Sequence, residues 1–438
     1  GYASKYHFEA NGAYNGSEKF GPDFRFAFFP SLSAGWTISN EGFMDNVKFL
    51  NFLKVRGSWG RIGDDNVSGT WLYADQWGYG GNAQMGSPVA NTPYTFYRIT
   101  TLGNPAISWE TVEKRNLGIE YGFFKGKISG SVDFFRDLRS DIIIDGNGRA
   151  VPTYFGAAAP KANLGRVLGK GYEIELKLNH TFGSGLQAWA NFNVTHAKNT
   201  VLFRDDPELL PNYQKNAGQQ MGQYKAYLDY GYLQSWDDIY GSTIRNANNA
   251  NKLAGDYNII DYNADGIIDQ YDLVPYGYSG RPQNTYNASV GFDWKRLAIF
   301  VQFYGVNNVT RDVPFPTFNT YSGSNVAYVE GTYWTKENGG GDVPLPRYSS
   351  LMGTGGEGTR YMYDGSYVRL KNAEVAYTLS GVQVGRIGLK SCRIFLNGNN
   401  LLLWTKMPDD RESNFSGGGG SGAYPTVKRF NVGIDITL

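Results

Sequence analysis

The sequence predicts an all-β fold in which antiparallel strands form a transmembrane β-barrel. Three observations predict it. Apolar and polar residues alternate with a period of two, long connections alternate with short ones, and 16% of the 438 residues are aromatic, beside 57 glycines. Period-two alternation indicates strands with two different faces. The loop asymmetry and the aromatic content are typical of barrels that cross a membrane.

The alternation is clearest in residues 172–182. The apolar set is Tyr172, Ile174, Leu176, Leu178 and Phe182, and the polar set is Glu173, Glu175, Lys177, Asn179 and Thr181. Residues 427–438 repeat the pattern, with apolar residues at every second position from Phe430 to Leu438. We expect the apolar rows to face lipid and the polar rows to face solvent or a plug.

Counting such segments gives about twelve strands. The expected ranges are 3–14, 25–38, 50–60, 109–123, 125–137, 171–182, 186–198, 283–294, 297–307, 365–379, 388–404 and 427–438. Tryptophans near the ends of these ranges fit the aromatic belts of membrane interfaces. They are Trp59, Trp109, Trp189, Trp294 and Trp404.

Long and short connections are expected to alternate between these strands. Long ones are expected near 15–24, 61–108, 138–170, 199–282, 308–364 and 405–426, and short ones near 39–49, 124, 183–185, 295–296 and 380–387. Outer-membrane barrels have short periplasmic turns and long extracellular loops. If the chain ends in the periplasm, every long connection lies outside the cell.

Composition narrows the other possibilities. The net charge is +1 with no basic stripe, so no nucleic-acid partner is expected. There is no run of about 18 apolar residues that would span a membrane as a helix. The single Cys392 cannot form an internal disulfide. A soluble multi-domain β-protein is the alternative, because alternation fits any half-buried antiparallel sheet.

Several stretches carry a family resemblance. They are 15–22 (NGSEKFGP), 28–36 (FFPSLSAGW), 53–60 (LKVRGSWG), 109–120 (WETVEKRNLGIE), 365–372 (GSYVRLKN) and 395–401 (FLNGNNL). Together these motifs resemble SusC/RagA-type TonB-dependent outer-membrane transporters, and the resemblance runs over essentially the whole chain.

The resemblance implies a barrel of about 22 strands with an N-terminal plug and a TonB box. It also implies a location in the bacterial outer membrane. This chain would be the C-terminal part of the barrel, without the plug domain, and residues 1–438 would form one barrel portion. Family members work with a SusD-like surface lipoprotein and with the TonB complex. Leu438 departs from the aromatic residue that usually ends such barrels.

One motif indicates a metal site. Asp261, Asn263, Asp265, Ile267, Asp269 and Asp272 occupy positions 1, 3, 5, 7, 9 and 12 of an EF-hand-like loop. Gly266 permits the sharp turn, and Ile267 would contribute its backbone carbonyl. Calcium prefers such oxygen ligands, so we expect Ca²⁺ in a long extracellular loop. The alternative is an Asp/Asn-rich turn without metal.

Aromatic residues in the long connections are candidate ligand contacts, because sugar rings stack on aromatic faces. The candidates are Trp71, Tyr73, Trp77, Tyr79, Trp236 and Trp334. Tyr240, Tyr321, Tyr328 and Tyr333 lie in the same connections. The alternatives are packing between loops and contact with the lipoprotein partner.

The sequence therefore predicts TonB-dependent import of a large nutrient, an oligosaccharide first, together with a SusD-like lipoprotein. Peptide import by the same architecture, a passive porin or an adhesion barrel are the alternatives, and a soluble glycan-binding β-protein is a further one. No enzyme is expected. His7, His180 and His196 lie in separate expected strands, and no catalytic motif is present.

Overall fold

The computed structural model describes residues 1–82, 94–242, 244–246, 252–312, 334–341, 359, 362–384, 387–407 and 426–437. The chain divides into two compact units. The first contains residues 1–178, 195–210 and 215–221, and the second contains residues 179–194, 211–214 and 222–438. Leu438, Tyr321, Tyr328 and Tyr333 lie outside the described residues.

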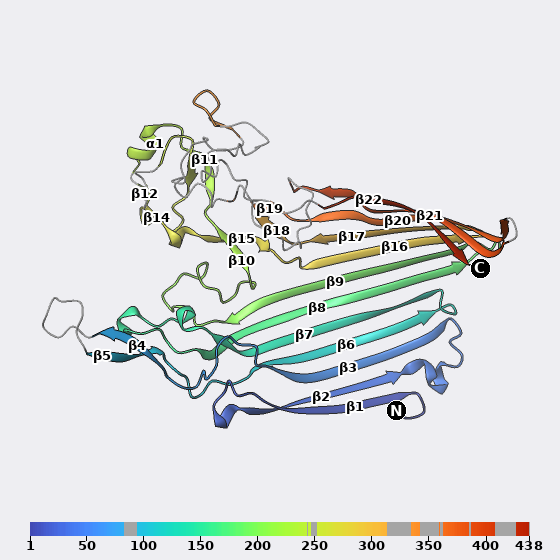
Figure 1. The fold of residues 1–438 in the computed structure, drawn as a ribbon, viewed down its shortest axis with the longest axis horizontal. Coiled ribbons are helices and arrows are strands. Elements are labelled where there is room, and N and C mark those ends of the chain that lie inside the picture. Colours follow the sequence, from blue (N-terminus) through green and yellow to red (C-terminus); the bar gives the residue numbers. More distant parts are fainter. Residues whose placement is uncertain are drawn as a thin grey trace. The chain divides into compact units, whose positions relative to one another are not determined.

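Twelve strands form one sheet in the order β1-β2-β3-β6-β7-β8-β9-β16-β17-β20-β21-β22 (Figure 1). Their bounds are β1 Tyr6–Gly16, β2 Phe26–Thr37, β3 Leu50–Asp64, β6 Glu110–Phe123, β7 Ile128–Ile144, β8 Ala162–Thr181, β9 Gln187–Phe203, β16 Asn284–Trp294, β17 Leu297–Asn307, β20 Tyr367–Val384, β21 Ile387–Thr405 and β22 Arg429–Thr437. The expected strands and the all-β antiparallel class are confirmed. Among the described residues, no helix is long and apolar enough to cross a membrane.

Several strands run further than expected on the side of the long connections. β7 continues to Ile144, β8 already begins at Ala162, and β9 continues to Phe203. The connection expected at 138–170 therefore shrinks to 145–161. The register of β7 against β8 shifts between Arg139 and Ile143. Such a bulge breaks period-two alternation locally, which hid these extensions in the sequence. The turn expected at 380–387 is mostly strand.

The two faces of the sheet differ in chemistry. On β7 and β8, Phe134 lies opposite Tyr172, and Val132 lies opposite Ile174. Ile174 is 38% exposed, and Val432 on β22 is 77% exposed. The apolar row of β8 is thus not packed in a dry protein interior. We call this side the apolar face, and the side carrying Arg56 and Asp133 the polar face.

Aromatic rings and glycines are often cross-strand neighbours. A Cβ atom on Gly291 would lie 2.3 Å from the indole of Trp189, and one on Gly63 would lie 2.0 Å from the ring of Phe29. A ring covering a glycine restores the packing that the glycine lacks. This pairing explains why the chain is rich in both residue types.

The connection between β2 and β3 is held by one carboxylate. The Tyr6 hydroxyl donates to Glu41 Oε1 at 2.7 Å, Trp36 Nε1 donates to the same oxygen at 3.0 Å, and Lys5 Nζ donates to Oε2 at 3.1 Å. These donors lower the pKa of Glu41 to about 2, with the Tyr6 hydroxyl contributing most. Hydrogen bonds to the charged form favour that form.

This cluster predicts an acid-sensitive turn. Because the folded pKa of Glu41 is depressed, its stabilisation is complete above the unfolded value of 4.5 and is lost as the pH falls towards about 2. We expect Glu41→Gln to reduce the difference in urea midpoint between about pH 6 and about pH 3. Asp45→Asn, in the same turn, is the control and should leave that difference unchanged. An equal effect of both substitutions would contradict the assignment.

Candidate functional site

In the first unit, an ion-pair network covers the polar face. Arg56 on β3 donates through Nε to Glu120 Oε1 at 2.9 Å and through Nη1 to Asn116 Oδ1 at 3.2 Å, both on β6. Its Nη2 donates to Asp133 Oδ2 on β7 at 2.9 Å. One guanidinium therefore joins three strands, and its fork geometry suits two carboxylates at once.

A second network lies nearer the long connections. Arg139 on β7 donates through Nη2 to Asp64 Oδ2 at 3.0 Å and pairs with Glu110. Glu110 is buried, and its other oxygen accepts the backbone N–H of Ile143 at 2.9 Å. Burial of a carboxylate requires such partners. Ion pairs between charged side chains thus stabilise the polar face, and the exposed parts of these side chains contact solvent.

In the second unit, the polar face carries a chain of amides. Gln302 Nε2 donates to Asn287 Oδ1 at 3.0 Å, and Asn372 Nδ2 donates to Gln302 Oε1 at 2.6 Å. Asn399 continues the chain to Asn372. Amides both donate and accept, so this surface can exchange hydrogen bonds with hydroxyl-rich or peptide ligands.

The connection expected at 199–282 contains a folded module of its own. Short sheets pair β10 (Gln223–Ala226) with β15 (Val274–Ser279), β11 (Asp229–Tyr232) with β13 (Tyr257–Ile259), and β12 (Arg245–Asn246) with β14 (Ile267–Ile268). Helix α1 (Trp236–Tyr240) follows β11 (Figure 1). The buried core of this module contains Tyr227, Tyr232, Tyr257, Ile259 and Ile268 from this connection, together with Trp334 from the connection expected at 308–364. We call this the outer module.

The EF-hand-like residues form a compact loop in the outer module. Asp261 Oδ2 accepts the N–H of Gly266 at 2.8 Å, and Asp265 Oδ1 accepts the N–H of Ile267 at 2.8 Å. Gly266 has a φ of 87°, in the left-handed region that the expected turn requires. Asn263 Oδ1 accepts the N–H of Asp265 at 2.9 Å. The spacing of these residues therefore produces a tight turn in which side-chain oxygens accept hydrogen bonds from backbone N–H groups.

The last acid of the motif closes the loop. Asp272 is 0% exposed, and its Oδ1 accepts the N–H of Tyr262 at 2.7 Å. Its Oδ2 accepts the N–H of Asp269 at 2.8 Å. Tyr213, whose hydroxyl donates to the carbonyl of Tyr271 at 2.8 Å, has its pKa raised by burial and then by the charge of Asp272. Asp272 is thus an acceptor for the loop backbone.

One carboxylate oxygen of the motif has no such partner. Asp261 Oδ1 is buried and makes no hydrogen bond in the described part of the chain. Among the described residues, no three His, Cys, Asp or Glu side chains gather closely enough to hold a metal ion. The remaining acids, Asp265 and Asp269, are engaged with the loop backbone.

The candidate aromatic contacts of the first unit lie at and near a hairpin. β4 (Gln76–Asn82) pairs with β5 (Thr95–Thr101), and Trp77 and Tyr79 stand at alternate positions of β4. Trp77 is 64% exposed, and the ring of Tyr79 meets that of Tyr97 edge-on at 6.2 Å. Trp71 is also exposed. Tyr73 is half-buried against a cluster that contains Phe20, Phe29, Leu72, Ile107 and Trp109.

The two candidates of the second unit differ from each other. Trp236 on α1 is 53% exposed and stacks on Tyr240 with a centroid distance of 5.8 Å. Trp334 is 5% exposed and belongs to the core of the outer module, where Nε1 donates to Gln234 Oε1 at 3.3 Å. Sequence reasoning gave both the same role. The apolar residues around Tyr232 and Ile259 are the feature of the sequence that could have indicated the buried core.

Comparisons with known proteins give a consistent result. No family model matches the chain. TonB-dependent receptor P26 of Formosa agariphila is 26% identical over 459 aligned residues, which cover all of this chain and 45% of the relative. TonB-dependent receptor SusC of Bacteroides thetaiotaomicron is 27% identical over 62% of this chain and 27% of its own length. The chain thus spans less than half the length of these relatives.

Solved structures show the same fold. A RagAB peptide importer in an open-open state superposes with a TM-score of 0.75 at 20% identity, over all of this chain and 46% of that one. A second RagAB structure gives a TM-score of 0.72. These relatives agree with the family resemblance that the sequence motifs carry. The twelve-stranded sheet with its exposed apolar face agrees with it as well. The chain is therefore similar over its whole length to TonB-dependent receptors of the outer membrane, and it shares the fold of the RagAB structures.

Proposed function

We propose that this chain forms part of the wall and outer loops of a TonB-dependent importer for a large nutrient. The observation that carries the proposal is the two-faced sheet. Its apolar face is exposed, as contact with lipid requires, and its polar face carries the networks around Arg56 and Gln302. Such a wall encloses a wet or plugged interior. The role is transport and not catalysis.

The proposed cargo is an oligosaccharide, bound at the outer mouth together with a SusD-like lipoprotein. Exposed Trp71, Trp77 and Trp236 offer ring faces of the kind that stack on sugars. Peptide import is the competing proposal, and it is favoured by the fold shared with a protein described as a peptide importer. A plug upstream and the TonB complex would supply gating and energy.

Uptake by cells that express the full-length protein tests this proposal. Cells with the transporter and its companion lipoprotein should grow on oligosaccharides of the correct class, and deletion of TonB should abolish that growth. Growth on peptides alone would show that the cargo is a peptide and not an oligosaccharide. Uptake that persists without TonB would indicate a passive pore, and surface attachment without uptake would indicate an adhesion barrel.

Substitutions in the β4–β5 hairpin test whether its aromatic rings contact the oligosaccharide. We expect Trp77→Ala to weaken oligosaccharide binding by about tenfold, because an aromatic contact contributes roughly 0.5–1.5 kcal/mol beyond its buried area. Tyr154→Ala is the matched control, since Tyr154 is an exposed loop ring of the same unit. Isothermal titration calorimetry of the full-length protein measures both. Equal losses would indicate an indirect effect.

We further propose that the 261–272 loop binds Ca²⁺ when Asp261, Asn263, Asp265, the carbonyl of Ile267, Asp269 and Asp272 turn their oxygens from the loop backbone towards the ion. The support is the buried Asp261 Oδ1, which no donor satisfies in the described residues, and the tight turn at Gly266. A hard cation is the natural partner for an unpaired buried carboxylate oxygen. Its role would be to rigidify the outer module.

Calorimetric titration of the chelator-treated protein with CaCl₂ tests this site. Asp261→Asn combined with Asp265→Asn should weaken binding by tenfold or more, because fewer ligand charges lower calcium affinity. Asp237→Asn, an exposed acid on α1 of the same module, should leave the affinity unchanged. Absence of binding to the unsubstituted protein would refute the site.

A further inference from the structure

On the apolar face of the first unit, the apolar rows give way to a row of cations. Leu117, Phe134 and Tyr172 lie side by side on β6, β7 and β8, and the next row on the same face is Arg115, Arg136 and Lys170. The pairs Arg115–Arg136 and Arg136–Lys170 are direct cross-strand neighbours. Figure 1 shows these three strands adjacent to one another.

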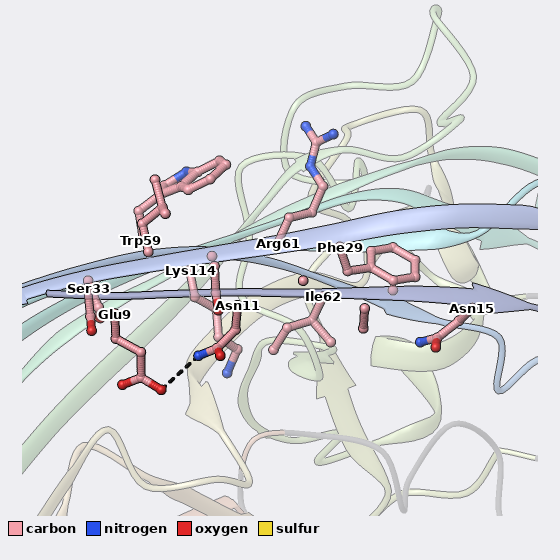
Figure 2. A pocket seen from close by; sticks show the side chains of 16 residues that line it. Glu9, Asn11, Asn15, Phe29, Ser33, Trp59, Arg61, Ile62 and Lys114 are labelled. Atoms are coloured by element: carbon pink, nitrogen blue, oxygen red, sulfur yellow. Dashed lines mark hydrogen bonds between the residues drawn. The ribbon is translucent and has the colours of Figure 1, made fainter.

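These cations are poorly neutralised. Arg136 and Lys170 are exposed, and neither makes an ion pair within the described residues. Arg115 pairs with Glu113 at 2.5 Å, and Glu113 also lies opposite Arg61 on β3. Figure 2 shows Arg61 and Trp59 on one side of the sheet, with Glu9 and Lys114 on the other. Like charges directly opposite each other destabilise a sheet unless an anion joins them.

The row is a local feature of β6–β8. At the corresponding ends of the apolar rows on β1 and β2, the rings of Tyr14 and Phe26 stack at 5.5 Å. On β17 and β21 of the second unit, Phe303 and Trp404 occupy such positions, with ring centroids 6.4 Å apart. Aromatic side chains are the usual boundary of a membrane barrel. On β6, β7 and β8, Arg115, Arg136 and Lys170 stand in their place.

The position of the row fits the edge of the hydrocarbon layer. Arg136 lies about 26 Å along β7 from Ile128 at the rise of an antiparallel strand. With a strand tilt of about 40°, this corresponds to a height of roughly 20 Å, close to the limit of the apolar band of such barrels. The row lies towards the long connections, which begin beyond Ile144 and before Glu110.

We propose that Arg115, Arg136 and Lys170 bind the phosphate groups of a phosphorylated lipid in the leaflet that the long connections face. The acyl chains would lie along the two apolar rows below, Leu117–Phe134–Tyr172 and Ile119–Val132–Ile174. Arginine forks bind phosphate oxygens in pairs, and lysine adds a point charge. This proposal depends on the membrane location and not on the imported cargo.

Lipid binding to the full-length protein in detergent tests the proposal. The probes are lipid A with two phosphates and the same lipid after enzymatic dephosphorylation, and native mass spectrometry measures the bound fraction. Arg115→Gln, Arg136→Gln and Lys170→Gln are combined in one variant. The control combines Lys48→Gln, Lys125→Gln and Lys127→Gln, which remove the same charge from exposed positions in the β2–β3 and β6–β7 connections.

We expect the triple variant to bind diphosphorylated lipid A on the order of 100-fold more weakly, since each cation near an anionic lipid surface contributes roughly a factor of five. The control variant should bind like the unsubstituted protein, and dephosphorylated lipid should not distinguish the three proteins. Heat-modifiable mobility in SDS gels confirms that each barrel is folded before the lipid is added.

Other outcomes would overturn the proposal. Equal binding of phosphorylated and dephosphorylated lipid would remove the role of phosphate. Competition by millimolar inorganic phosphate, without preference for lipid, would indicate a site for the free ion. Loss of an acidic protein partner in the triple variant, with lipid binding unchanged, would assign the row to protein recognition. Transport activity is measured separately, so failure here leaves the importer proposal intact.

Discussion

Trp334→Ala is expected to unfold the outer module while leaving the twelve-stranded sheet in place. The indole is 5% exposed and packs with Tyr232, Tyr257 and Ile268 in the core of the module. Truncation of a large buried aromatic costs about 3–5 kcal/mol. The module is held by sheets of two to six residues a strand, so a loss of this size is comparable with its whole local stability.

Hydrogen exchange measures this effect directly. Amides of β11 and β13 should lose protection in Trp334→Ala, while amides of β16 and β17 keep theirs. Trp236→Ala is the matched control, because Trp236 is a tryptophan of the same module that is 53% exposed. It should change protection by less than about 1 kcal/mol. If both variants lose the same protection, the core assignment of Trp334 is wrong.

The membrane strands could be predicted almost residue by residue where alternation is regular. The expected ranges 283–294 and 297–307 compare with β16 at Asn284–Trp294 and β17 at Leu297–Asn307. Each such strand has one face in lipid and one in a polar environment, so the pattern is written into the local sequence. Strands that follow each other in the sequence, such as β16 and β17, pair with each other, so their pairing could be predicted without knowledge of distant contacts.

The outer module could not be predicted in the same way. Asp229 on β11 pairs with Ile259 on β13, and Arg245 on β12 pairs in parallel with Ile267 on β14. Strands of two to four residues are too short to show a period, and their pairing depends on tertiary contacts around Trp334. The position of an aromatic residue in a long connection therefore does not tell whether it is buried or exposed.

The structure of the candidate metal loop could be predicted only in part. The spacing of Asp261, Gly266 and Asp272 predicted a tight turn with a glycine in the left-handed region, and the structure has both. The sequence did not reveal that Asp272 is buried with its oxygens on backbone N–H groups. Spacing fixes which oxygens lie near one turn, whereas the partner of each oxygen depends on burial and on neighbours such as Tyr213.

Ile174→Arg is expected to prevent stable insertion of the barrel. Ile174 lies in the middle of the apolar row of β8, between Tyr172 and Leu176, and opposite Val132 on β7. An arginine on the lipid face near the bilayer midplane costs about 2–4 kcal/mol. Its long side chain has no acidic neighbour in that row. We expect a lower urea midpoint and a reduced folded fraction in SDS gels.

The neighbouring position provides the control. Glu173 lies on the polar face opposite Asp133, so Glu173→Arg places the new cation beside a carboxylate and in a polar environment. Its effect should stay below about 1 kcal/mol. Because the two residues are adjacent in one strand, the new arginines stand at nearly the same depth but on opposite faces of the sheet. If Glu173→Arg blocks insertion and Ile174→Arg does not, the apolar face is not the lipid face.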